Sequence, residues 1–107
     1  MALIRIWRTK VERGRAAEYE RFARDSSLPM FRQQAGFLGV LFAGDGADRI
    51  VVSFWQDHEA LEALAHSPTY AATVAEISRT GFLVGDSSSE VFPIHGGQWP
   101  TAPPDTA

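Results

Sequence analysis

Four side chains of this sequence have the chemistry to handle an oxygen-bearing aromatic molecule. His66 and Tyr70 are four residues apart and share a helical face if the chain is helical across Ser67-Pro68. A histidine of ordinary pKa accepts a proton from a phenol near neutral pH. Arg5 can hold a phenolate oxygen, and the indole of Trp55 can stack on a flat molecule or donate its N–H. We therefore expect His66 as a base and Arg5 and Trp55 as groups that stabilise an anion.

Three of these residues, Trp55, Arg5 and His66, also have a purely structural interpretation. Trp55 is a core aromatic if it only fills the junction of a strand and a helix. Arg5 would then pair with an acidic residue or extend its head group to water. His66 would be an exposed residue at a helix C-terminus, where its positive charge is favourable. The sequence leaves both interpretations open for all three.

The spacing of apolar residues predicts the elements that must position these side chains. A strand over 3–11 alternates, with Arg5 and Trp7 on one face. A helix over 15–34 is interrupted at Pro29, and Ser26 and Ser27 are candidates to cap the restarted part. The remaining predictions are strands over 37–42 and 49–55 joined by a hairpin turn at 44–48, a helix capped by Asp57, a helix from Ser67-Pro68 to Gly81, and a strand over 89–94.

This order predicts an α+β, ferredoxin-like fold: β-α-β-β-α-β, with four antiparallel strands and the helices on one face. The other face then carries apolar side chains with no helix over them, namely Ile4, Ile6, Ile50, Val52 and Phe54. A patch of this size is prone to aggregate if it stays in water. We therefore predict a homodimer in which two such sheets pack face to face.

Between sheet and helices we expect a pocket that a small molecule could occupy. A cavity of roughly 300 Å³ or more with convergent polar groups would favour ligand chemistry. Filling of that space by Trp7, Leu64 and Phe82 would favour a structural role. The residues expected to contact the ligand are Trp7, Phe22, Met30, Val51, Ser53, Leu64, Tyr70 and Val74.

Composition narrows the classes of function. The chain has 107 residues, a net charge of −3 and no cysteine. We predict one domain over 1–94 and a Pro/Gly-rich tail over 95–107. The acidic balance argues against nucleic acid or an anionic membrane as partner. Neither a signal peptide nor a metal-ligand cluster is recognisable, so we expect a cytoplasmic protein without a metal.

Several of these motifs together are similar to the antibiotic biosynthesis monooxygenase (ABM) domains, over roughly residues 2–94. The resemblance rests on Gly36-Phe37, on Trp55 at a strand end, and on the helix starts Asp57–Leu61 and Ser67–Tyr70. It implies a dimeric α+β barrel. The family includes cofactor-independent oxygenases of polyketide aromatics, quinol monooxygenases and heme-degrading enzymes.

Matching the functional residues of the family one by one separates these activities. At the positions of the Asn, Trp and His that heme-degrading members use, this chain has Trp7, Leu64 and Val74, and valine cannot ligate iron. Polyketide-oxidising members carry a Trp that matches Trp55. The resemblance thus implies a cofactor-independent monooxygenase of a small aromatic or quinol-type substrate.

The partners of that Trp in polyketide-oxidising members, an Asn and a Tyr, correspond to Val51 and Leu61 here. Their replacement leaves two other functions open. One is a non-catalytic module that binds a small ligand or a partner protein. The other is an isomerase or decarboxylase, because related barrels catalyse proton transfers.

Overall fold

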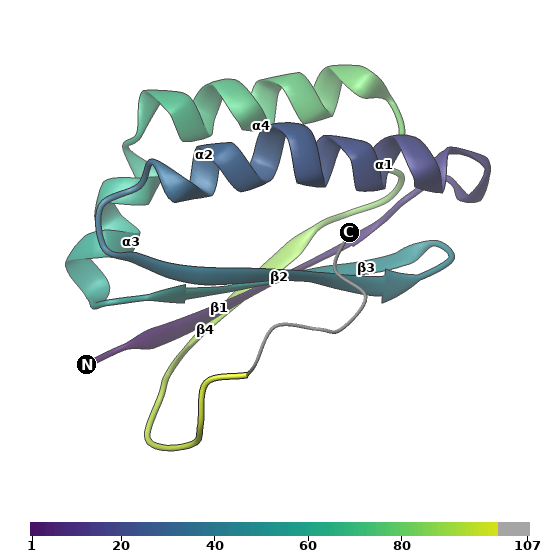
Figure 1. Ribbon diagram of the computed structural model, residues 1–107. Helices are drawn as coiled ribbons and strands as arrows, with labels where there is room; N and C mark the ends of the chain where they lie inside the picture. Colours follow the sequence, from purple (N-terminus) through teal and green to yellow (C-terminus); the bar gives the residue numbers. More distant parts are fainter. Residues whose placement is uncertain (101–107) are drawn as a thin grey trace.

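The computed structural model describes residues 1–100 and has the predicted order of elements with the helices on one side of the sheet (Figure 1). The strands are β1 (Leu3–Lys10), β2 (Phe37–Asp45), β3 (Asp48–Trp55) and β4 (Ser88–Pro93). The helical segments are η1 (Arg13–Arg15), α1 (Ala16–Phe22), η2 (Ala23–Ser27), α2 (Leu28–Arg32), α3 (His58–Ala65) and α4 (Pro68–Thr80).

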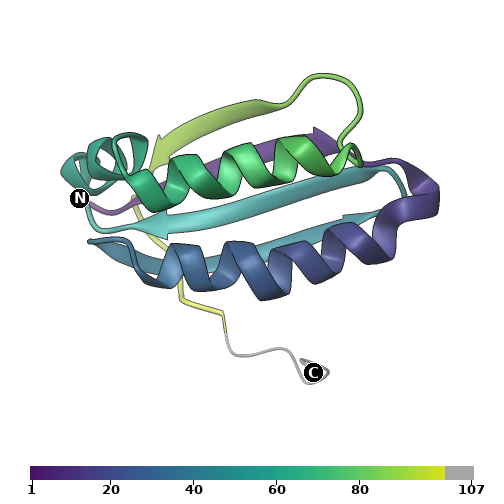
Figure 2. The same cartoon turned by 90° about the horizontal axis from the view of Figure 1, so that it is seen from above.

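The four strands form one antiparallel sheet in the order β2-β3-β1-β4. Seen from above, α1, η2 and α2 form one continuous rod along the β2 side, and α4 runs beside it nearer β1 and β4 (Figure 2). Arg5 pairs with Ser53 and Trp7 with Val51 across β1 and β3. Because side chains alternate along a strand, all four lie on the face under the helices, as predicted.

Local signals explain where the helices start and stop. The Asp57 carboxylate accepts the Ala60 N–H at 2.9 Å, and the Ser67 hydroxyl accepts the Tyr70 N–H at 3.3 Å. Gly81 ends α4 with a φ of +77°, a conformation in which glycine has no side-chain penalty. These predicted boundaries are confirmed.

The first helix is interrupted before Pro29, as expected, and it restarts as α2 with Pro29 in its first turn. The interruption is a π turn over Ala23–Ser27, in which the Leu28 N–H reaches the Ala23 carbonyl. A wider turn accommodates a residue that has no N–H and whose ring crowds the turn before it. The expected capping by Ser26 and Ser27 is wrong: no side-chain cap bond forms at Ser27, where the backbone is already helical.

The hydrophobic core consists of two clusters. Trp55 is fully buried where β3 meets α2 and α3, against Phe31, Leu64 and the ring of Phe37. The second cluster gathers Val11, Tyr19, Phe22 and Phe82 at the opposite end of the sheet. Members of both clusters line the cavity that lies between them.

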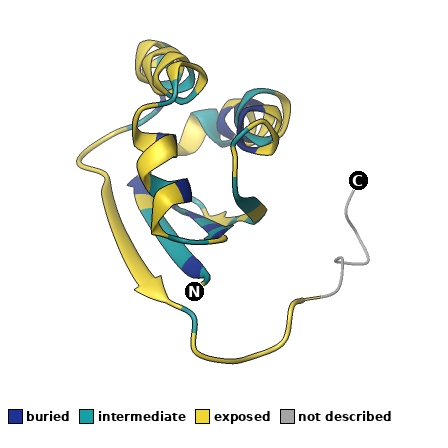
Figure 3. Cartoon of the chain, turned by 90° about the vertical axis from the view of Figure 1, so that its left-hand side faces the viewer, coloured by how far each residue is buried: buried dark blue, intermediate teal, exposed yellow. Residues whose placement is uncertain are grey.

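The sheet face away from the helices is only partly covered in the described residues. Ile4, Ile6, Ile50, Val52 and Phe54 are half-buried, and the edge strand β4 is exposed along its length (Figure 3). Trp99, in the segment after β4, packs edge-on against Phe54 with ring centroids 5.1 Å apart. None of the described helices is long and apolar enough to cross a bilayer.

Candidate functional site

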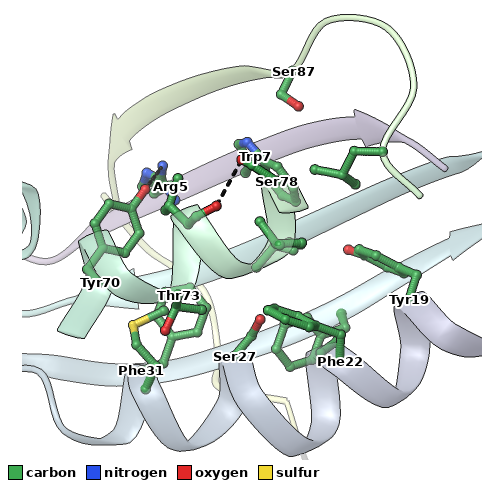
Figure 4. Close-up of a pocket in the computed structure, with 17 residues that line it drawn as sticks. Arg5, Trp7, Tyr19, Phe22, Ser27, Phe31, Tyr70, Thr73, Ser78 and Ser87 are labelled. Atoms are coloured by element: carbon green, nitrogen blue, oxygen red, sulfur yellow. Dashed lines mark hydrogen bonds between the residues drawn. The ribbon is translucent and has the colours of Figure 1, made fainter. Parts of the chain in front are cut away.

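A cavity of about 240 Å³ lies between the sheet, the rod of α1 to α2, and α4 (Figure 4). This volume falls short of the roughly 300 Å³ that we expected of a site for ligand chemistry. Of the three residues expected to fill the space, only Trp7 reaches it. Most lining side chains are apolar. They are Arg5, Trp7, Tyr19, Phe22, Ala23, Ser27, Met30, Phe31, Phe42, Val51, Tyr70, Thr73, Val74, Ile77, Ser78, Leu83 and Ser87.

One end of the cavity carries a cation and a phenol in contact. The Arg5 guanidinium donates a hydrogen bond to the Tyr70 hydroxyl at 3.2 Å and lies 6.0 Å from the centre of the Tyr70 ring. β1 supplies Arg5 and α4 supplies Tyr70, so the pair forms when the second half of the chain docks on the first strand. Its N–H and O–H groups converge on the space under α4 (Figure 4).

Arg5 has no carboxylate partner. None of the ion pairs among residues 1–100 includes it, and no aspartate, glutamate or histidine lines the cavity. Among residues 1–100, the ion pair that the structural interpretation of Arg5 expects does not form. A guanidinium has five N–H donors, so donors remain for an oxygen of a ligand, where a surrounding apolar wall strengthens the attraction.

Tyr19, from α1, stands at the other end of the cavity (Figure 4). Burial raises the pKa of the Tyr19 hydroxyl above its ordinary value. Its phenol is therefore neutral near pH 7 and can donate a hydrogen bond.

Seven of the residues predicted for the site line this cavity together: Arg5, Trp7, Phe22, Met30, Val51, Tyr70 and Val74. They come from β1, β3, α1, α2 and α4. Their functional roles remain predictions. Their gathering follows from strand alternation and from the apolar stripes of the helices.

Trp55, Ser53 and Leu64 lie outside the cavity. The Trp55 indole N–H donates to the Ser53 hydroxyl at 2.8 Å, and both residues are fully buried. Trp55 shares the helix-facing side of the sheet with the cavity residues, but it sits at the strand end where α3 closes over it. Its N–H and its ring faces are thus occupied by the protein's own core.

His66 is also outside the cavity, at the exposed C-terminal end of α3. Its Nδ1 lies 2.9 Å from the Glu62 carbonyl oxygen, an acceptor to which the N–H tautomer donates. The chain turns at Ser67 to start α4, so His66 and Tyr70 belong to two different helices. The expected common face does not form.

Several lining residues were missed by the sequence reasoning. The π turn η2 aims Ala23 and Ser27 at the cavity, and β2 contributes Phe42. Pro29 inside a helical pattern was the available signal for an irregular turn.

No group of three or more potential metal-ligating side chains occurs within residues 1–100.

Comparison with known proteins identifies relatives of this chain. The family model described as antibiotic biosynthesis monooxygenase matches residues 2–76. No curated protein sequence gives a significant match.

Solved structures share the fold. A monooxygenase from the gene ActVA-Orf6 of Streptomyces coelicolor, in complex with nanaomycin D, superposes with a TM-score of 0.78 at 16% identity, covering 94% of this chain and 93% of that one. SnoaB, a cofactor-independent oxygenase from Streptomyces nogalater, gives 0.71 at 19% identity over 90% and 95% of the two chains. NE2512 of Nitrosomonas europaea, a protein of unknown function, gives 0.76 at 18% identity over 94% and 96%. At these identities the likeness shows a common fold.

Proposed function

The chain belongs to the antibiotic biosynthesis monooxygenase family, and from that premise we propose that it is a cofactor-independent monooxygenase of a small aromatic or quinol-type substrate. The observation that carries the proposal is the Arg5–Tyr70 pair at one end of a mostly apolar cavity. An apolar wall with a few convergent donors suits a flat ring that carries a phenolic oxygen. Two structural relatives described as oxygenases, one of them cofactor-independent, support the reaction class.

Arg5 would promote ionisation of the substrate. A guanidinium close to a bound phenol stabilises the phenolate, so the pKa of that phenol falls. The proton passes to solvent, because no carboxylate or histidine of residues 1–100 lines the cavity. The resulting anion is electron-rich, and the Tyr70 hydroxyl beside it offers a second hydrogen-bond donor.

Oxygen would then react with the bound anion directly. Transfer of one electron from the phenolate to O2 gives a radical pair that joins as a carbon–peroxide bond. For an anthrone-type substrate, the phenolate forms by loss of one proton from the CH2 group, and the peroxide then forms at that carbon. Cleavage of the O–O bond with loss of the remaining C–H proton releases water and leaves a carbonyl. One oxygen atom enters the product, the other leaves as water, and the two hydrogens of that water come from the CH2 group.

Oxygen uptake by the purified protein tests this proposal. We expect uptake with at least one member of a panel of hydroquinones and anthrones, and with ¹⁸O2 we expect one labelled atom in the product. Arg5→Met should lower kcat/KM roughly 100-fold, in the range seen when one donor to a developing anion is removed. Arg21→Met, at an exposed position of α1, is the matched control and should retain full activity.

A second function has one specific observation in its favour. Within the described part of the chain, no carboxylate or imidazole lines the cavity, as expected of a non-catalytic binding module. Binding of panel members without oxygen uptake would contradict the oxygenase and support the binding module.

We also propose that the protein works as a homodimer. The half-buried apolar side chains on the sheet face away from the helices need a cover, and a second copy offers an equal patch. Burying apolar surface at about 25 cal/mol per Å² would favour that association.

A further inference from the structure

Tyr19 holds a polar group inside the cavity that the proposed chemistry does not use. The residue is only 4% exposed, yet its hydroxyl makes no hydrogen bond with any other residue in the described part of the chain. Every fully enclosed polar side-chain atom of those residues has a partner. The Tyr19 hydroxyl therefore is not fully enclosed, and Figure 4 shows it pointing into the cavity.

The position of this phenol is fixed by its neighbours. The edge of Phe82 packs on the ring at a centroid distance of 5.8 Å, and the Arg49 guanidinium lies 5.8 Å from the ring centre. Arg49 is in turn held by the Glu20 carboxylate at 2.6 Å and the Gly46 carbonyl at 3.1 Å. A ring clamped in this way presents its hydroxyl in one direction before any ligand arrives, which lowers the cost of binding.

The direction is toward the other polar end of the cavity. Figure 4 shows the Tyr19 hydroxyl aimed along the cavity toward the side where Arg5 and Tyr70 meet, with apolar side chains between them. A buried donor without a partner costs free energy until an acceptor reaches it. Water or a ligand oxygen must fill that place.

Most other hydroxyls in the lining are already engaged. Ser78 donates to the Val74 carbonyl, Thr73 donates to the Thr69 carbonyl, and Ser87 pairs with Thr9. Ser27 is partly exposed, so water can reach it. Tyr19 is thus the deeply buried hydroxyl that a ligand can satisfy.

We propose that Tyr19 is a specificity-determining residue that binds a second oxygen of the ligand, at the end opposite the Arg5–Tyr70 pair. The ligand class is then a flat aromatic with hydrogen-bonding oxygens at both ends, such as a para-quinol or para-quinone. The inference rests on the proposed function only in taking an aromatic molecule as the occupant of the cavity. It requires no oxygen chemistry.

Anaerobic binding of two probes tests it. Naphthalene-1,4-diol and 1-naphthol differ by one hydroxyl, and their binding is measured by quenching of tryptophan fluorescence, with Trp7 in the cavity wall. Wild-type protein should bind the diol five- to tenfold more tightly than 1-naphthol, because one neutral hydrogen bond contributes about that much to affinity. Tyr19→Phe should remove that preference and leave the affinity for 1-naphthol unchanged.

The chain offers a matched control, because Tyr70 is its only other tyrosine. Tyr70→Phe should weaken the binding of both probes by a similar factor, since both place an oxygen beside Arg5. Circular dichroism and thermal unfolding verify that each variant is folded.

Three results would overturn the inference. The first is an equal loss of affinity for both probes in Tyr19→Phe, and the second is an unchanged preference for the diol in that variant. The third is failure of the diol to bind wild-type protein. Absence of oxygen uptake would overturn the oxygenase proposal alone, since the binding assay contains no oxygen.

Discussion

At the scale of single residues, Arg5 lines the cavity and His66 does not. Both were candidates because each can act on a phenol, but only Arg5 reaches the cavity, where its partner is a hydroxyl rather than a carboxylate. His66 lies in solvent at the end of α3. A charge beside the substrate can favour the phenolate without any base in the wall, which is the role we propose for Arg5.

The consequence for His66 is a prediction about pH. His66→Gln should leave kcat/KM for oxygen uptake within about twofold of wild type, because the imidazole is remote from the cavity. The activity should rise with pH along the ionisation of the bound phenol, and this curve should be the same in the variant. Steady-state rates from acid to alkaline pH measure both. If the variant no longer lost activity at low pH, or if its rate fell tenfold, His66 would be the base after all.

Gly36 shows at the scale of elements how α2, β2 and α3 come together. Its φ is +75°, and a Cβ at this position would lie 2.5 Å from the Cβ of Ala60 on α3. A side chain here would meet both backbone strain and a clash. This contact lets α3 close over the end of the sheet where Trp55 is buried.

Gly36→Ala should therefore destabilise the fold by about 2–4 kcal/mol, the sum of a strained backbone and an overpacked contact. Urea unfolding followed by tryptophan fluorescence measures the loss. Gly14→Ala is the control, because a Cβ there meets nothing within 4 Å. It should change stability by less than about 0.5 kcal/mol.

A second variant separates the two causes. Adding Ala60→Gly to Gly36→Ala removes the clash but not the positive φ, so the double variant should show a favourable coupling energy. Purely additive losses would mean that steric contact with α3 is not the constraint on Gly36.

The two faces of the sheet differ at the scale of the whole molecule. The helices bury one face and enclose the cavity, while the described residues leave the other face partly open apart from the contact of Trp99 with Phe54. The proposed dimer would cover this face. Val52, on the central strand β3, lies in the middle of it.

Val52→Glu should weaken dimerisation by roughly 100-fold or more, because a carboxylate would be buried without a partner. Sedimentation velocity over a range of protein concentrations measures the shift. Ala72→Glu, on the exposed surface of α4 in the helical layer, is the control and should leave the assembly unchanged. A wild-type protein that is monomeric throughout that range would contradict the proposed dimer.

The sequence by itself determined the local structure of this protein. Helix ends were predicted from single residues, namely Asp57, Ser67-Pro68 and Gly81, and from the spacing of apolar residues. Hydrogen bonds between residues close in sequence form these ends. The order of the elements followed, and with it the fold and the family resemblance. Strand alternation also placed Arg5 and Trp7 under the helices, because that pattern is a property of the backbone.

Only the tertiary structure decided which residues meet in the cavity. Arg5 and Trp55 share one face of the sheet, but Arg5 lines the cavity and Trp55 is buried in the core. This difference depends on where α3 and α4 dock along the sheet. The turn at Ser67 separated His66 from Tyr70, and the π turn before Pro29 brought Ser27 into the lining. Docking depends on side chains distant in sequence that pack together, so no local pattern specifies it.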